Sequence, residues 1–181
     1  TLALSLHRAG LKPLLIDPVV FDAQLAPSFD GRSSAIAYAA FRQWRALGLG
    51  EALEPHAQRI EQILVTDGRT PGAAGGGPTP FFLRFDSAEI ADRSEGEPLG
   101  YLLENRHTRT ALAAAVLEAG IEVLAPARVV KATFEPRAAS VILSDGRTLT
   151  APLVVGAEGR GSVIRAAAGI GTLGWDYRQT G

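Results

Sequence analysis

Apolar and polar residues are arranged in two patterns along this chain, and together they predict a mixed α/β fold. Short apolar runs with β-branched residues, bounded by Gly, Pro or Asp, predict strands; they cover 11–17, 60–67, 99–103, 121–124, 127–134, 140–143 and 153–155. Longer stretches that end near a glycine predict helices; they cover 1–8, 35–47 and the residues after 105 up to 119. Asp145-Gly146 predicts a hairpin turn between the last antiparallel strands.

Polar residues directly before the helical stretches are predicted as N-caps. Ser33 and Ser34 precede the stretch that begins at Ala35, Asn105 precedes the third helix, and Ser162 precedes a short helix near the end. Side chains of these types accept hydrogen bonds from the first free amides of a helix.

The segment 151–165, APLVVGAEGRGSVIR, organises this prediction. A short strand suited to burial in a parallel sheet leads into a turn of small residues and then a helix. Gly156 and Gly159 permit a close approach of backbone to a ligand, and Glu158 offers an acceptor beside them. The alternative is an ordinary strand-turn-helix corner whose glycines only make the turn, and spacing alone leaves both open.

The first helix and the strand that follows it, which ends at Asp17, are typical of the second half of a βαβ nucleotide-binding unit. Such a unit expects a strand and a G-x-G-x-x-G loop before the helix. We therefore expect the chain to be an internal fragment. An acid at the end of the second strand commonly accepts hydrogen bonds from a ribose; the alternative is a solvated loop carboxylate.

Two middle segments carry weaker signals. The glycine- and proline-rich stretch 68–80 predicts a flexible connection and lacks the Lys-Ser/Thr of a phosphate loop. The aromatic patch at 81–85 is either an edge strand or the lining of an apolar substrate site.

Composition excludes several classes of function. The chain has 181 residues, a formal net charge of −1 and scattered Lys and Arg, which argues against nucleic-acid binding. It has no cysteine, and its three histidines lack metal-ligand spacing, so we predict no metal site. No apolar run approaches the roughly 20 residues of a membrane span.

Three motifs resemble one family. G-A-E-G-R-G-S-V-I-R, at 156–165, resembles the second flavin fingerprint of p-hydroxybenzoate-hydroxylase-type FAD-dependent monooxygenases, with Glu158 where that family has Asp. F-D-G-R-S-S-A-I-A, at 29–37, and L-G-Y-x-x-E-N-R-x-x-R-x-A-L, at 99–112, resemble its UbiH-like branch, the ubiquinone-biosynthesis hydroxylases.

The resemblance implies a set of cofactor-binding residues. In the family, two arginines lie against the flavin, an acid lies near its ribityl and pyrophosphate region, and one backbone position brackets the adenine. Carried over to this sequence, the set is Asp17, Arg32, Arg109, Val129, Glu158 and Gly159. Two alternatives stay open: Arg32 forms a salt bridge with Asp30, and Arg109 is a solvated helical arginine. No catalytic side chain is assigned.

The resemblance also implies an incomplete Rossmann-like FAD-binding domain of the p-hydroxybenzoate hydroxylase type with part of a β-rich substrate domain. The expected boundaries are 1–59 for the first part of the FAD-binding domain, 60–98 for a substrate-domain insertion, 99–168 for the second part, and 169–181 for the start of the substrate-domain sheet.

The implied activity of the intact protein is aromatic-ring hydroxylation in ubiquinone biosynthesis. With FAD as cofactor and NAD(P)H as reductant, the protein would transfer one oxygen atom from molecular oxygen to a polyprenylated phenol. Alternatives are a related flavoprotein that does not oxygenate, such as a prenyl reductase, and a non-catalytic module. We expect a cytoplasmic protein. Peripheral association with the inner membrane or with other ubiquinone-biosynthesis proteins is left open. We expect the 181-residue chain by itself to be inactive and to bind FAD poorly.

Overall fold

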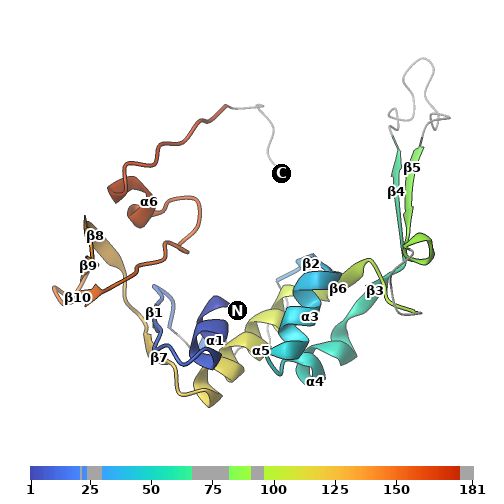
Figure 1. Cartoon of the computed structure of the whole chain (residues 1–181), viewed down its shortest axis with the longest axis horizontal. Coiled ribbons are helices and arrows are strands. Elements are labelled where there is room, and N and C mark those ends of the chain that lie inside the picture. The colour runs from blue at the N-terminus through green and yellow to red at the C-terminus, as the bar shows by residue number, and fades with distance from the viewer. Residues whose placement is uncertain (21, 24–29, 67–81, 91–95, 176–181) are drawn as a thin grey trace. The chain divides into compact units, whose positions relative to one another are not determined.

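A computed structural model describes residues 1–20, 22–23, 30–66, 82–90 and 96–175 (Figure 1). The chain divides into two compact units: Thr1–Pro13 with Gln24–Ile121, and Leu14–Ala23 with Glu122–Gly181. The first unit contains the helices α1 (Leu2–Arg8), α3 (Tyr38–Ala46), α4 (Gly50–Leu53) and α5 (Asn105–Glu118). The second contains a parallel strand pair, an antiparallel meander and the short helix α6 (Val163–Ala167).

A three-stranded antiparallel sheet supports the first unit. Its central strand, β6 (Gly100–Glu104), lies between β2 (Ser33–Ala37) and β3 (Gln58–Ile60). The first residue of β6 has to be glycine, because a Cβ atom on Gly100 would lie 2.3 Å from the carbonyl oxygen of Ile36. That close approach fixes the register in which Ser33 lies opposite Glu104.

The core of the first unit forms where α3 packs on this sheet. Tyr38, Phe41 and Trp44, three residues apart, are buried on one face of α3. The Phe41 ring stacks on Tyr101 of β6, with ring centroids 4.0 Å apart. Burying such aromatic side chains contributes on the order of 2 kcal/mol each, so this contact anchors the helix to the sheet.

A two-stranded ribbon extends from the same unit. It pairs β4 (Gln62–Thr66) with β5 (Phe82–Asp86), and the short 3₁₀ helices η1 (Glu54–His56) and η2 (Ser87–Glu89) precede and follow it. The strand predicted over 60–67 is confirmed for Gln62–Thr66, while Ile60 belongs to β3 of the first sheet. The strand predicted in the aromatic patch is present from Phe82, and Phe81 and Asp67 lie outside the described residues.

The second unit contains two sheets. Strand β1 (Leu14–Ile16) pairs in parallel with β7 (Glu122–Leu124). The hairpin predicted at Asp145-Gly146 is confirmed, and it is part of an antiparallel meander of β8 (Val129–Glu135), β9 (Ala138–Leu143) and β10 (Thr148–Ala151). Alternate residues of β9 are buried, and two of them, Val141 and Leu143, form a core with Ile164 of α6.

The predicted helix ends are confirmed at α1, α3 and α5. After each helix a glycine with positive φ is followed by an apolar residue, and that residue's amide donates to a carbonyl five positions earlier: Leu11 to Leu6, Leu49 to Trp44 and Ile121 to Val116. This bond pattern is the Schellman motif. The glycine near the end of each helical stretch therefore located three helix ends correctly.

The N-caps predicted for two of the helices are wrong. Ser33 and Ser34 lie in strand β2, and the helix begins only at Tyr38. Pairing with β6 along the whole segment overrides the helical preference of its alanines. Asn105 is the first helical residue rather than the cap, and its side chain bonds Ser34 instead. Ser162 is a true cap, since its hydroxyl accepts from the Arg165 amide at 2.9 Å.

The strand predicted at 153–155 is also wrong. These residues belong to no strand of the described chain. Val154 packs against the core of the second unit, while Leu153 and Val155 are 72% and 52% exposed. An apolar run indicated burial on two faces, but without a paired neighbour only one of its three side chains packs inward.

The predicted flexible connection at 68–80 lies outside the described residues. Within the described part of the chain, no helix is long and apolar enough to cross a membrane.

Candidate functional site

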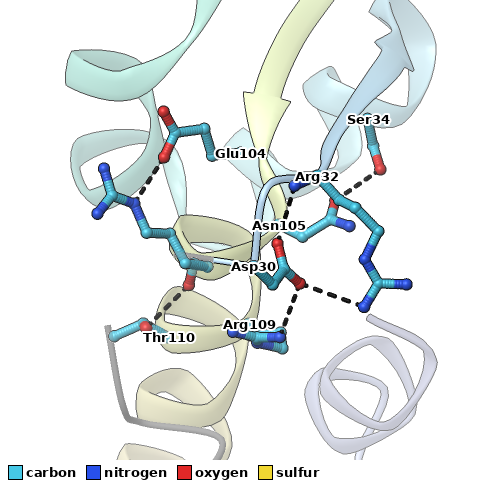
Figure 2. Close-up of polar contacts among 8 residues, drawn as sticks. Asp30, Arg32, Ser34, Glu104, Asn105, Arg109 and Thr110 are labelled. Atoms are coloured by element: carbon cyan, nitrogen blue, oxygen red, sulfur yellow. Dashed lines mark hydrogen bonds and ion pairs between the residues drawn. The ribbon is translucent and has the colours of Figure 1, made fainter. Parts of the chain in front are cut away.

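The first turn of α5 is bonded directly to the start of β2, and this junction positions the predicted arginines (Figure 2). The Asn105 amide donates to the Arg32 carbonyl at 3.0 Å. The Ser34 hydroxyl donates to Asn105 Oδ1 at 2.7 Å. These two bonds join segments about 70 residues apart in sequence and place the beginning of the helix beside Arg32.

A tight turn precedes β2. The Arg32 amide donates to Asp30 Oδ1 at 3.1 Å, and Gly31 between them has φ +74°. An aspartate that accepts from the amide two residues ahead forms an Asx turn, and glycine takes the positive φ without steric cost. The turn directs the Arg32 and Asp30 side chains toward each other.

The second oxygen of Asp30 bonds both predicted arginines. Asp30 Oδ2 lies 3.3 Å from Nη2 of Arg32 and 3.1 Å from Nη1 of Arg109, as Figure 2 shows. The exposed fractions of the side chains are 20% for Asp30, 34% for Arg109 and 74% for Arg32. Two guanidinium groups on one carboxylate leave a net charge of +1, with Arg32 open to solvent.

The carboxylate of Asp30 stays charged well into the acid range. The Arg32 amide hydrogen bond lowers the pKa of Asp30 most strongly; partial burial opposes it, and the charges of Arg32 and Arg109 lower it further. The net shift is downward, so Asp30 keeps its negative charge at neutral pH.

Arg106, one position after Asn105, has a different role from Arg109. Its Nε donates to Glu104 Oε2 at 2.6 Å, and its carbonyl accepts from the Thr110 hydroxyl at 2.9 Å. These bonds lie within the β6–α5 junction. Arg109, one helical turn from Asn105, is the arginine that the fold directs to Asp30.

In the second unit, Glu158 folds back onto the helix that follows it. Its Oε1 accepts from the Ile164 amide at 2.9 Å. Partial burial raises the pKa of Glu158, but hydrogen bonds from the Ile164 backbone and from other groups at the start of α6 outweigh it, and the pKa is lowered. The carboxylate is thus charged and held at the beginning of α6.

The two glycines near Glu158 are required by the structure for different reasons. A Cβ atom on Gly156 would lie 3.0 Å from Cβ of Ile164, so this glycine lets α6 pack closely. Gly159 has φ +82° and no heavy atom within 4 Å of the position of a Cβ. Only Gly159 therefore leaves open space of the kind that the ligand interpretation requires.

Asp17 directly follows β1. Its Oδ1 accepts from the Val19 amide at 2.8 Å. Its backbone amide donates to Leu124 and its carbonyl accepts from Ala127, so the residue is held at the carboxyl end of the parallel pair. Val129 begins β8 beside a register shift between Val129 and Lys131.

The structure therefore groups the six predicted residues into two sets. Arg32 and Arg109 come together in the first unit through Asp30. The other four, which belong to the second unit, are Asp17, Val129, Glu158 and Gly159. Their binding roles stay predictions.

Sequence reasoning missed Asp30, which it considered only as a competing salt-bridge partner for Arg32. No local signal distinguishes this residue, because the same tripeptide, Asp-Gly-Arg, occurs three times in the chain, at 30–32, 67–69 and 145–147. The contact that sets Asp30 apart comes from a helix 79 positions away.

The donors of the first unit fit an anionic nucleotide cofactor. Guanidinium groups bond phosphate and ribityl oxygens strongly, often through two nitrogens at once. Arg32, 74% exposed, has room to donate to such a group while Asp30 holds it from behind. Among the described residues, no group of three or more His, Cys, Asp or Glu side chains could hold a metal ion.

Mixed helices and sheets with two arginines joined on one carboxylate suit a protein that binds an anionic nucleotide cofactor. Residues 1–178 match the family model of the FAD binding domain. The chain belongs to this family.

Curated relatives and solved structures agree with that assignment. The chain is 40% identical over 182 residues to the ubiquinone hydroxylase UbiL of Rhodospirillum rubrum, covering 99% of this chain and 39% of the relative. It is 29% identical to the 3-demethoxyubiquinol 3-hydroxylase of Escherichia coli, covering 99% of this chain and 43% of that protein. The chain thus spans about two fifths of the length of these relatives.

The fold is shared with the OxyS anhydrotetracycline hydroxylase from Streptomyces rimosus. That structure superposes with a TM-score of 0.65 over 97% of this chain and 32% of its own, at 21% identity. The family and fold named by the sequence resemblance are confirmed.

Proposed function

We propose that the full-length protein containing this chain is an FAD-dependent aromatic-ring hydroxylase of ubiquinone biosynthesis. It would place one oxygen atom from molecular oxygen on a polyprenylated phenol, with NAD(P)H as reductant. The observation that carries the proposal is the 40% identity to a ubiquinone hydroxylase across 99% of the chain. The arginine pair on Asp30 supports it, because both arginines are those that the resemblance places against the flavin.

The residues of the first unit would bind and orient the cofactor. Arg32 and Arg109 would donate to its phosphate and ribityl oxygens. Bound FAD supplies the redox and oxygen-transfer chemistry, and the protein supplies position and exclusion of water. No side chain of this chain is assigned as an acid or a base.

The residues of the second unit would bind the sugars and the adenine. The carboxylates of Asp17 and Glu158 are acceptors for hydroxyl groups, Val129 would contact the adenine through its backbone, and Gly159 leaves room for close approach. Glu158 already accepts from Ile164, so we propose that its other oxygen faces the cofactor. The boundaries 1–59, 60–98, 99–168 and 169–181 remain our proposal for the FAD-binding and substrate-domain parts.

The test is oxygen consumption by the purified full-length protein with NADH or NADPH. A ubiquinone precursor should stimulate it, and the product should carry one ¹⁸O atom when the reaction runs under ¹⁸O₂. Oxidation or reduction of the precursor without ¹⁸O in the product would favour the related flavoprotein without oxygenation. A full-length protein that purifies colourless and does not take up FAD would favour the non-catalytic module.

Peripheral contact with a membrane is a further part of the proposal, since a polyprenylated phenol partitions into lipid. Co-flotation of the full-length protein with liposomes tests it. Protein that stays at the bottom of the gradient would contradict it.

A further inference from the structure

Asp30 is an anion at the place where the proposed function puts an anionic cofactor. Simple electrostatics disfavours such a group, because a carboxylate repels phosphate and reduces the positive charge of the cluster from +2 to +1. Its contacts therefore have to offer a compensating advantage.

Those contacts hold both cationic side chains in place. Asp30 accepts from the Arg32 amide, from Arg32 Nη2 and from Arg109 Nη1. The first bond shapes the turn, and the other two fix one guanidinium from β2 and one from α5 relative to each other.

The exposure of Arg32 makes this restraint valuable. A long side chain that is 74% exposed samples many rotamers, and fixing it upon ligand binding has an entropic cost. A carboxylate that fixes it beforehand removes part of that cost. The same carboxylate keeps Arg109 directed toward Arg32.

We propose that Asp30 is a positioning residue for the FAD site, which orients Arg32 and Arg109 and does not itself bind the cofactor. This inference rests on the proposed function. It goes beyond it by assigning a role to a negative charge that the cofactor would otherwise disfavour.

The substitution Asp30→Asn gives expectations of opposite sign for the two accounts. If Asp30 were only a nearby surface charge, neutralising it would raise the net charge to +2 and tighten FAD binding. As a positioning residue, its neutralisation weakens FAD binding despite the added positive charge. We expect the Kd for FAD of the full-length protein, measured by quenching of flavin fluorescence, to rise about tenfold.

Asp145→Asn is the matched control. Asp145 accepts from the Arg147 amide at 3.0 Å and from Arg147 Nε at 2.8 Å across Gly146, so it forms the same turn without a second arginine. The Kd for FAD should stay within about twofold of the parent value in this variant. Asp30→Ser is the second test variant, because serine keeps an acceptor for the Arg32 amide and removes the carboxylate.

A double-mutant cycle tests whether Asp30 affects FAD binding through Arg109. Asp30→Asn should weaken FAD binding less in an Arg109→Gln background than in the parent, since the positioned group is then absent. A purely structural role would give the same loss in both backgrounds.

The outcomes separate this inference from the proposed function. A parent protein that takes up no FAD overturns the proposed function and this inference with it. A parent that binds FAD, together with Asp30→Asn and Asp30→Ser variants that bind equally well or more tightly, overturns the inference alone. Weaker binding in both variants, with Asp145→Asn unchanged and a reduced effect in the Arg109→Gln background, supports it.

Discussion

Two turns of identical sequence have different surroundings in this protein. Asp30-Gly31-Arg32 and Asp145-Gly146-Arg147 both form an Asx turn, with amide-to-carboxylate distances of 3.1 and 3.0 Å and glycine φ values of +74° and +86°. Their carboxylates differ in exposure, with 20% for Asp30 and 46% for Asp145.

The difference comes from what the rest of the fold brings to each turn. The turn at 145–147 joins β9 to β10, and its carboxylate pairs only with Arg147 in the described contacts. The turn at 30–32 lies beside the first turns of α5, which adds Arg109 to the same carboxylate. A local motif therefore determines a turn, and a tertiary contact makes one of the two described copies a candidate binding site.

Arg109→Gln should give the largest difference between the two turns. If the proposed function holds, it removes one charge-assisted hydrogen bond to the cofactor, a loss of about 1.5–3 kcal/mol, or about 10- to 150-fold in Kd. Arg147→Gln removes the matching charge from the other turn and should leave the Kd unchanged. Isothermal titration of both full-length variants with FAD measures this, and equal losses would contradict the distinction.

Arg32→Gln should have a smaller effect on FAD binding than Arg109→Gln. Arg32 is 74% exposed, and one of its nitrogens already bonds Asp30. Its proposed bond to the cofactor is therefore screened by water more strongly than that of Arg109. We expect a loss of about 1 kcal/mol, or about fivefold in Kd, which shrinks as salt is added. A loss that is independent of salt would argue against an electrostatic contact.

Glycine-to-alanine substitutions test the part that the two turns share. Gly31→Ala and Gly146→Ala each place a Cβ in the left-handed region, which costs about 1 kcal/mol of folding stability. Thermal unfolding should show similar decreases for both variants. Only Gly31→Ala should also weaken FAD binding, because it displaces Arg32; an equal effect of Gly146→Ala would remove the functional contrast.

The acid dependence of the two turns should be the smallest measurable effect. The Arg32 amide lowers the pKa of Asp30 and the Arg147 side chain lowers that of Asp145, each with further contributions. A carboxyl whose pKa is lower in the folded state stabilises the fold above its unfolded pKa, and this stability is lost as pH falls through the folded pKa. Carboxyl ¹³C NMR titration should show both midpoints below that of a model aspartate; an ordinary midpoint at Asp30 would mean that the Arg32 amide bond and the arginine contacts do not form in solution.

Much of the fold could be predicted where the signal is local. The helix ends at Gly10, Gly48 and Gly120, the hairpin at 145–146 and the cap at Ser162 depend on a few adjacent residues. The strand at Ser33–Ala37 could not, because its alanines favour a helix and only pairing with β6 makes it extended. The segment 153–155 failed for the opposite reason, since its apolar residues suit a strand but no neighbour in the described chain pairs with them.

In the candidate site, too, the local features could be predicted and the contact between distant segments could not. Family motifs identified Arg32 and Arg109 as separate residues, and their chemistry suited phosphate and ribityl oxygens. That Asp30 joins them depends on the register of β2 against β6 and on the helical turn between Asn105 and Arg109. Such a contact across 79 positions has no signature in the neighbouring sequence.

Equilibrium dialysis of the full-length protein against FAD tests the central claim most directly. The account predicts saturable binding of one FAD per chain, with the absorption spectrum of a flavoprotein, and a marked loss of that binding in Arg109→Gln with Arg147→Gln unaffected. A full-length protein that is folded by circular dichroism and retains no FAD would contradict it.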